Sequence, residues 1–103
     1  MPQKGESMGL RFEWDKPKAA RNLQKHGVSF DEASTVFHDV LARIFDDEDH
    51  SQHEAREIII GHSVNGKLLV VSFTERAVNN LRIISARPAT TQERDDYEKS
   101  QDL

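Results

Sequence analysis

The stretch that decides the fold is residues 56–87, REIIIGHSVNGKLLVVSFTERAVNNLRIISAR. It contains three runs rich in valine, isoleucine and leucine, separated by two turn signals, Asn65-Gly66 and Asn79-Asn80. Asn-Gly between alternating apolar residues is a strong signal for a tight hairpin. The stretch therefore predicts three consecutive antiparallel strands, which are expected at 56–64, 67–76 and 81–87.

A strand and a helix are predicted near the start of the chain. Residues 10–14 alternate weakly and are aromatic, which favours a short strand. Asp15 has the side chain of an N-cap, and Pro17 falls in the first helical turn, where a missing N–H costs nothing. Gly27 has the position of a C-cap. The helix is therefore expected between Asp15 and Gly27.

A second helix is predicted directly after the first. Ser29 and Glu32 have the spacing of a capping box, in which each side chain binds a backbone N–H of the first turn. Apolar residues then recur at helical spacing and predict a core face made of Phe30, Ala33, Phe37 and Val40. The helix is expected to end near His38-Asp39.

The remaining predicted elements are a strand at 41–45 and a last helix of about two turns, which opens on the capping box of Thr90 and Glu93. The expected order is strand, helix, helix, four strands, helix. Short turns between consecutive strands predict a largely antiparallel sheet with the helices on one side, which is an α+β fold. The expected organisation is a disordered leader at 1–9, a single domain at 10–98 and a polar tail at 99–103.

Composition limits the function classes. The 103-residue chain has no cysteine, which excludes disulfides, thiolate catalysis and zinc–thiolate sites. No apolar run approaches the roughly 18–20 residues that span a bilayer, so we expect a cytoplasmic protein without a membrane partner. The net charge is −4, yet basic residues gather in 11–26 and 67–87. Such local basic surfaces can contact phosphates, because screening confines each charge to about 8–10 Å.

An acidic stretch, residues 46–53, reads DDEDHSQH and combines carboxylates with two histidines. Such a group of side chains can hold a metal ion. Carboxylates this dense more often form a solvated loop, and loop residues have no fixed geometry for a closed coordination shell. We therefore expect a solvated loop and no metal site.

Strand alternation puts hydroxyl and guanidinium groups together on one face of the predicted sheet. Thr74 and Arg76 share a face on the middle strand, and Ser85 and Arg87 share one on the last strand. Arginine forks bind phosphate oxygens in a bidentate manner and hydroxyls add hydrogen bonds, so this face is a candidate phosphate site. The same pattern is typical of the solvent side of an antiparallel sheet, and both interpretations stay open.

The same alternation predicts which face of the sheet two further residues of the last strand occupy. Ile83 is expected on the face of Ser85 and Arg87. Arg82 is expected on the opposite face unless a bulge re-aims it. The role of Arg82 therefore depends on the local geometry of this strand.

Two groups of residues form a recognisable pattern. The first group is FEWD at 12–15, then Lys18-Ala19, Asn22 and KHGVSF at 25–30. The second group is Gly61, Gly66, Val70-Val71, Thr74, Arg76, RIISAR at 82–87, Glu93 and Tyr97. Together they resemble the BrnT family, and the similarity spans about residues 11–97.

The resemblance implies a RelE-like fold and a ribonuclease toxin of a type II toxin–antitoxin pair. The implied reaction is metal-independent cleavage within RNA, in which a 2′-hydroxyl attacks its own phosphate without any cofactor. The implied partners are the RNA substrate and a cognate BrnA-like antitoxin with a ribbon-helix-helix DNA-binding domain. That antitoxin is expected to inhibit the toxin and to provide its contact with operator DNA.

Such a reaction needs a base, an acid and cations near the phosphorus. His26 is the first candidate, because histidine exchanges protons readily near neutral pH. Lys25 is expected to stabilise charge or act as the acid, and Arg76 and Arg87 are expected to clamp the phosphate. Supporting contacts with the substrate are expected from Lys18, Thr74, Arg82, Ser85 and Arg56.

A structural role is the alternative for these residues. His26 stands beside a helix C-terminus, where histidine can satisfy carbonyls and the helix dipole, and Lys25 can simply be solvated. The alternative function is a non-catalytic RNA- or protein-binding module. An enzyme needs His26 or a lysine to converge with Arg76 and Arg87 on one phosphodiester, so we expect the first helix to pack over that end of the sheet.

Overall fold

A computed structural model of the protein describes residues 9–48 and 55–101. The expected leader, apart from Gly9, lies outside the described residues. The same holds for residues 49–54 of the acidic stretch and for residues 102–103 of the expected tail. No described helix is long and apolar enough to cross a membrane.

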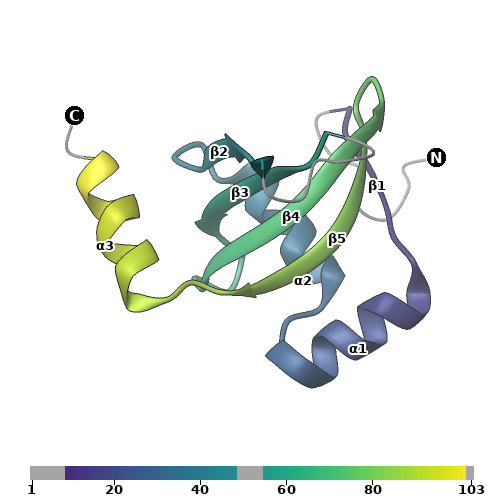
Figure 1. The fold of residues 1–103 in the computed structure, drawn as a ribbon, viewed down its shortest axis with the longest axis horizontal. Helices are drawn as coiled ribbons and strands as arrows, with labels where there is room; N and C mark the ends of the chain where they lie inside the picture. Colours follow the sequence, from purple (N-terminus) through teal and green to yellow (C-terminus); the bar gives the residue numbers. More distant parts are fainter. Residues whose placement is uncertain (1–8, 49–54, 102–103) are drawn as a thin grey trace.

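The described elements follow the predicted order, with a 3₁₀ turn added after the second helix. The strands are β1 (Arg11–Glu13), β2 (Arg43–Asp46), β3 (Glu57–His62), β4 (Leu68–Ala77) and β5 (Asn80–Pro88). The helical elements are α1 (Lys16–His26), α2 (Phe30–Thr35), the 3₁₀ turn η1 (Val36–His38) and α3 (Thr91–Ser100). This arrangement confirms the α+β class (Figure 1).

The strands form one sheet in the order β1-β5-β4-β3-β2. Strands β2 to β5 pair antiparallel with their sequence neighbours, as the turn signals predict. Strand β1 instead runs parallel to β5, with Phe12 beside Leu81. Parallel pairing needs a long connection between the two strands, and here the connection is most of the domain.

The predicted helix caps are present at α1 and α3. The Asp15 carboxylate accepts a hydrogen bond from the backbone N–H of Lys18 at 3.0 Å, and Gly27 ends the helix in the left-handed region at φ 70°. Thr90 and Glu93 form both bonds of a capping box at α3. Helix α3 has ten residues, so it is longer than the predicted two turns and includes part of the expected tail.

The second helix differs from its prediction at its first cap and at Val40, whereas its helical backbone ends near His38-Asp39 as expected. Ser29 accepts from the backbone N–H of Glu32, but the Glu32 carboxylate accepts from the Ser63 hydroxyl at 2.7 Å, so a tertiary contact replaces half of the expected capping box. At the other end, the backbone becomes extended at Asp39. Val40 is 95% exposed and not in the core, because helical spacing no longer applies to it.

The core lies between one face of the sheet and the layer of α1, α2 and η1 (Figure 1). The Phe37 ring contacts Phe12 at 5.2 Å and Phe73 at 5.0 Å between ring centroids, and so joins η1 to β1 and β4. The buried residues of this core are Val28, Phe30, Ala33, Val36, Ile59, Leu69, Val71, Phe73, Leu81, Ile83 and Ala86. The opposite side of the sheet, defined by Ile58, Val70, Ser72 and Ser85, is called the open face below.

A bulge in β5 changes which side chains share a face. Ser72 pairs with Ser85, but the next residue of β4, Phe73, pairs with Ile83, so Ile84 is the extra residue. Ile83 consequently points into the core beside Phe73 and is 1% exposed. The prediction that Ile83 shares a face with Ser85 is therefore wrong, because simple alternation does not allow for the bulge.

The same bulge re-aims Arg82. Arg82 pairs with Thr74, and paired residues of an antiparallel ladder point to the same side of the sheet. Thr74 shares the face of Ser72 by alternation. Arg82 thus lies on the open face with Ser85, which is the orientation expected from the sequence only if a bulge is present.

Helix α3 lies at one end of the open face, away from α1 and α2 (Figure 1). Its contacts include Arg43, His62 and Arg87, which belong to that face by strand register. The guanidinium of Arg43 donates to the carbonyl of Ser100 at 2.8 Å, and the rings of His62 and Tyr97 are 5.6 Å apart. The expectation that all helices gather on one side is therefore wrong for α3.

Candidate functional site

Two pockets meet at Ser85. The helix pocket, of about 330 Å³, is lined by Lys18, Arg21, Asn22, Lys25, His26, Ile84 and Ser85. The sheet pocket, of about 380 Å³, lies on the open face and is lined by Asp47, Arg56, Ile58, Val70, Ser72, Ser85 and Arg87.

Asn22 fixes α1 beside β5. Its amide nitrogen donates to the carbonyls of Val28 at 2.9 Å and Ala86 at 2.8 Å, and its oxygen accepts from the N–H of Ala86 at 3.1 Å. Both backbone groups of Ala86 therefore have a partner on the edge of β5 that faces away from β4. This contact sets the distance between the polar side of α1 and Ser85.

The basic side chains of the helix pocket form a stripe along α1. Lys18, Arg21, Lys25 and His26 lie at positions i, i+3, i+7 and i+8, which fall on one side of a helix. None of the described residues that line this pocket carries a carboxylate. Concentrated positive charge of this kind attracts phosphate groups despite the negative net charge of the chain.

In the sheet pocket, Arg87 is already paired with an acid from α3. Its two terminal nitrogens donate to the two carboxylate oxygens of Glu93 at 2.7 and 2.8 Å. These bonds are the main reason why the pKa of Glu93 falls to about 2, and they also raise the pKa of Arg87. Arg87 therefore contributes less net charge to the pocket than a lone arginine.

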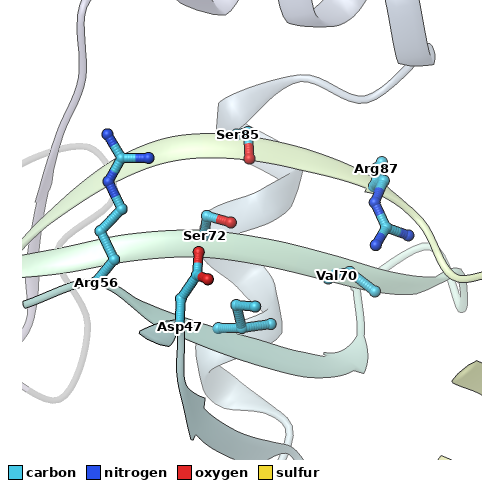
Figure 2. A pocket seen from close by; sticks show the side chains of 7 residues that line it. Asp47, Arg56, Val70, Ser72, Ser85 and Arg87 are labelled. Atoms are coloured by element: carbon cyan, nitrogen blue, oxygen red, sulfur yellow. The ribbon is translucent and has the colours of Figure 1, made fainter. Parts of the chain in front are cut away.

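The rest of the sheet pocket combines hydroxyls, an acid and a second arginine. Figure 2 shows Arg56 and Arg87 at opposite ends, with the hydroxyls of Ser72 and Ser85 between them. The carboxylate of Asp47 is directed toward Ser72 in the same view. The backbone N–H of Asp47 donates to the Arg56 carbonyl at 2.8 Å, which places these two residues side by side.

The structure brings part of the predicted set together. Lys18, Lys25 and His26 gather in the helix pocket, and Arg56 and Arg87 line the sheet pocket. Ser85 belongs to both pockets. Helix α1 thus packs beside the part of β5 that carries Ser85.

The structure does not place Arg76 near Arg87. Arg87 pairs with Val70, and Arg76 lies six residues farther along β4, which corresponds to about 20 Å at roughly 3.3 Å per residue. The two arginines therefore cannot clamp one phosphate in this arrangement, because β4 and β5 run antiparallel and put them at opposite ends of the hairpin.

Two other predicted residues have structural partners near that far end. The guanidinium of Arg82 donates to the Glu13 carboxylate at 2.7 Å, and this bond is the main reason why the pKa of Glu13 is lowered. Thr74 is 2% exposed, and its hydroxyl donates to the carbonyl of Ala55 at 2.8 Å. The side chains of Arg82 and Thr74 thus form hydrogen bonds within the protein.

Sequence reasoning did not select Arg21, Ser72 and Asp47. Arg21 could have been found from its helical spacing with Lys18, and Ser72 from its alternation with Thr74. Asp47 carries no such signal, since it lies beyond the end of β2 in an acidic run. Among the residues that the structure describes, no three His, Cys, Asp or Glu side chains are grouped to hold a metal ion.

The fold and pockets define a class of protein, a small α+β domain whose cationic pocket is suited to a phosphate-bearing partner. A family model described as the ribonuclease toxin BrnT of type II toxin–antitoxin systems matches residues 14–93. The chain therefore belongs to the BrnT family, which confirms the resemblance noted from the sequence.

A solved structure supports the same assignment. The 1.1 Å crystal structure of the Brucella abortus ribonuclease toxin BrnT matches with a TM-score of 0.63 and 25% sequence identity. The match covers 80% of this chain and 99% of the Brucella chain. A comparison with curated proteins gave no significant match.

Proposed function

We propose that this chain is a cytoplasmic, metal-independent endoribonuclease, the toxin of a type II toxin–antitoxin pair. Membership of the BrnT family supports the ribonuclease class. The observation that carries the site assignment is the basic stripe of α1, which meets a serine hydroxyl of β5 in one pocket. The scissile phosphodiester would bind in the helix pocket beside Ser85.

In the proposed reaction, His26 accepts the proton of the RNA 2′-hydroxyl, whose oxygen then attacks the adjacent phosphorus. A bond forms between the 2′-oxygen and phosphorus, and the bond to the 5′-oxygen breaks. Lys25 donates a proton to the leaving 5′-oxygen, so the products are a 2′,3′-cyclic phosphate and a 5′-hydroxyl. Lys18 and Arg21 offset the charge that develops on the phosphate, which is the role a metal ion has in other nucleases.

The remaining predicted residues have different proposed roles. Arg56 and Arg87, on the sheet pocket, contact the nucleotide next to the scissile phosphate. Arg76, near the far end of the β4–β5 hairpin, is too distant for that phosphodiester, and the guanidinium of Arg82 is bound to Glu13. Both arginines contact flanking RNA. We assign Thr74 a supporting role through its bond to the chain at Ala55.

The direct test is cleavage of a defined RNA by the purified protein in EDTA. Wild type is expected to leave 2′,3′-cyclic phosphate ends. The double variant Lys25→Ala with His26→Ala is expected to cleave at least about 100-fold more slowly, because general acid–base catalysis typically contributes 10²–10⁴-fold. Lys67→Ala, an exposed lysine outside both pockets, is the matched control and should stay within about twofold of wild type.

Each other outcome rejects a different part of the proposal. Cleavage that requires added Mg²⁺ would reject metal independence. Equal cleavage by wild type and the double variant would keep the enzyme and reject the site. No cleavage, even with ribosomes supplied, would favour a non-catalytic RNA- or protein-binding module.

We further propose a cognate BrnA-like antitoxin with a ribbon-helix-helix domain as the inhibitor, and operator DNA as a contact of that antitoxin only. A partner segment that covers a cationic pocket excludes phosphate from it. Adding the antitoxin is expected to stop cleavage, and the toxin alone is expected not to retard operator DNA on a gel. Retardation of that DNA by the toxin alone would contradict this assignment.

A further inference from the structure

The two pockets differ in charge although they share Ser85. The helix pocket has four basic side chains from α1, and its described lining carries no carboxylate. In the sheet pocket, Arg56 and Arg87 are matched by Asp47 in the lining and by Glu93 bound to Arg87. The formal charges of the sheet pocket therefore cancel. A phosphate therefore gains little electrostatic attraction in the sheet pocket. A neutral polar ring needs no net positive charge to bind there.

The surface of the sheet pocket also suits a flat, partly polar ring. Ile58 and Val70 provide an apolar floor, and Val70 is 6% exposed. Arg56 stands at one end of this floor (Figure 2). RNA-binding proteins hold unstacked bases by stacking them on apolar or guanidinium surfaces and by hydrogen-bonding their edges. A volume of about 380 Å³ is in the range of small-molecule pockets.

We propose that the sheet pocket binds the nucleobase next to the scissile phosphate and that the Asp47 carboxylate selects guanine. The proposal rests on the proposed ribonuclease function, because it divides one substrate between two pockets. The phosphate occupies the helix pocket, the base occupies the sheet pocket, and Ser85 lines both. This assignment goes beyond cleavage itself and predicts its sequence preference.

The preference for guanine follows from the edges of the four bases. Guanine presents two adjacent donors, the N1–H and the N2 amino group, which match the two oxygens of a carboxylate. Uracil presents one N–H between two carbonyls. Adenine and cytosine present an amino group beside a ring nitrogen lone pair, which repels the second carboxylate oxygen. Asp47 need not be without other partners, since an ionised carboxylate has about four acceptor positions.

The binding test uses the free, uncleaved nucleotide. Amide NMR spectra of the full chain would be recorded with 3′- and 5′-GMP and with the adenine, cytosine and uracil monophosphates. Guanine nucleotides are expected to bind at least about fivefold more tightly, with the largest shifts at Ser72 and Ser85. Asp47→Asn should reduce the preference to less than about twofold, because an amide has one acceptor oxygen where the carboxylate has two. Asp46→Asn, the exposed neighbour on β2, is the control and should retain the preference.

The cleavage test maps the ends produced from a random-sequence RNA. Wild type is expected to enrich guanine at one position beside the break, and Asp47→Asn should lose that enrichment. Cleavage with no guanine preference in either assay would overturn the base assignment and leave the ribonuclease intact. Preferential guanine binding without any cleavage would support the pocket and reject the proposed function. A guanine preference that persists in Asp47→Asn would overturn the role of Asp47. If that variant does not fold, comparing the binding of the four nucleotides to wild type still tests the pocket.

Discussion

Asn22 shows how one polar side chain sets the geometry of the candidate site. It is 8% exposed and makes three hydrogen bonds to backbone groups, two of them on the edge of β5. Buried polar groups are costly when unpaired, so these three backbone groups depend on Asn22. The same contact determines how far the basic stripe of α1 stands from Ser85.

We expect Asn22→Ala to lower the free energy of unfolding by about 2–3 kcal/mol, because it leaves buried backbone donors and acceptors unpaired. Chemical denaturation followed through Trp14, the one tryptophan of the chain, measures this loss. Gln24→Ala, an exposed change on the same helix, should cost less than about 0.5 kcal/mol. Equal losses for the two variants would show that the Asn22 contacts contribute no net stability.

At the scale of elements, α3 is joined to the sheet through the pair of Arg87 and Glu93. The pKa of Glu93 is lowered from an ordinary value of 4.5 to about 2, chiefly by the hydrogen bonds from Arg87. The folded state therefore binds this proton less readily than the unfolded state. The stabilisation is complete above about pH 4.5 and is lost as the pH falls toward 2.

We expect Glu93→Gln to reduce stability at pH 7 by about 1 kcal/mol, a discounted figure because the Arg87 side chain is 40% exposed and solvent screens the pair. Glutamine preserves the capping box of α3, so the substitution removes the charge and keeps the cap. Unfolding at pH 7, 4 and 3 should show the difference from wild type shrinking toward zero. Glu98→Gln, exposed on α3, should show no such trend, and a constant deficit for Glu93→Gln would contradict the ion-pair explanation.

For the whole molecule, the net charge is −4, but the candidate binding surface on α1 is positively charged. Lys18, Arg21 and Lys25 gather on one side of α1, and α1 lies beside the edge of β5 that faces away from β4. Because exposed charges are screened beyond about 8–10 Å, an RNA phosphate in this pocket responds to the stripe more than to distant carboxylates. The fold thereby separates a cationic site from an acidic remainder.

We expect binding of single-stranded RNA to weaken with salt, with a slope of log K against log salt near −2, since three phosphate contacts contribute about −0.7 each. Fluorescence anisotropy with a 2′-O-methyl RNA, which cannot be cleaved by 2′-hydroxyl attack, gives this slope directly. Lys25→Ala should reduce its magnitude by about 0.7, and Lys67→Ala should leave it unchanged. A slope near zero would rule out phosphate binding by the stripe.

Much of the fold could be predicted from local sequence signals. Asp15, Gly27 and the Thr90–Glu93 box mark helix ends, and Asn65-Gly66 marks a hairpin, because caps and tight turns depend on a few neighbouring residues. The order of elements, the α+β class and the clustering of basic residues near the start of the chain follow from the same kind of information.

Tertiary structure alone decided which residues meet. The extra residue Ile84 turns Arg82 onto the open face, and the antiparallel hairpin separates Arg76 from Arg87 by about 20 Å. Neither the parallel pairing of β1 nor the bond between Arg87 and Glu93 has a local signal. Caps and turns are specified over three or four residues, whereas strand register and side-chain partners depend on the packing of the entire chain, so the sequence determined the elements and the tertiary structure determined the site.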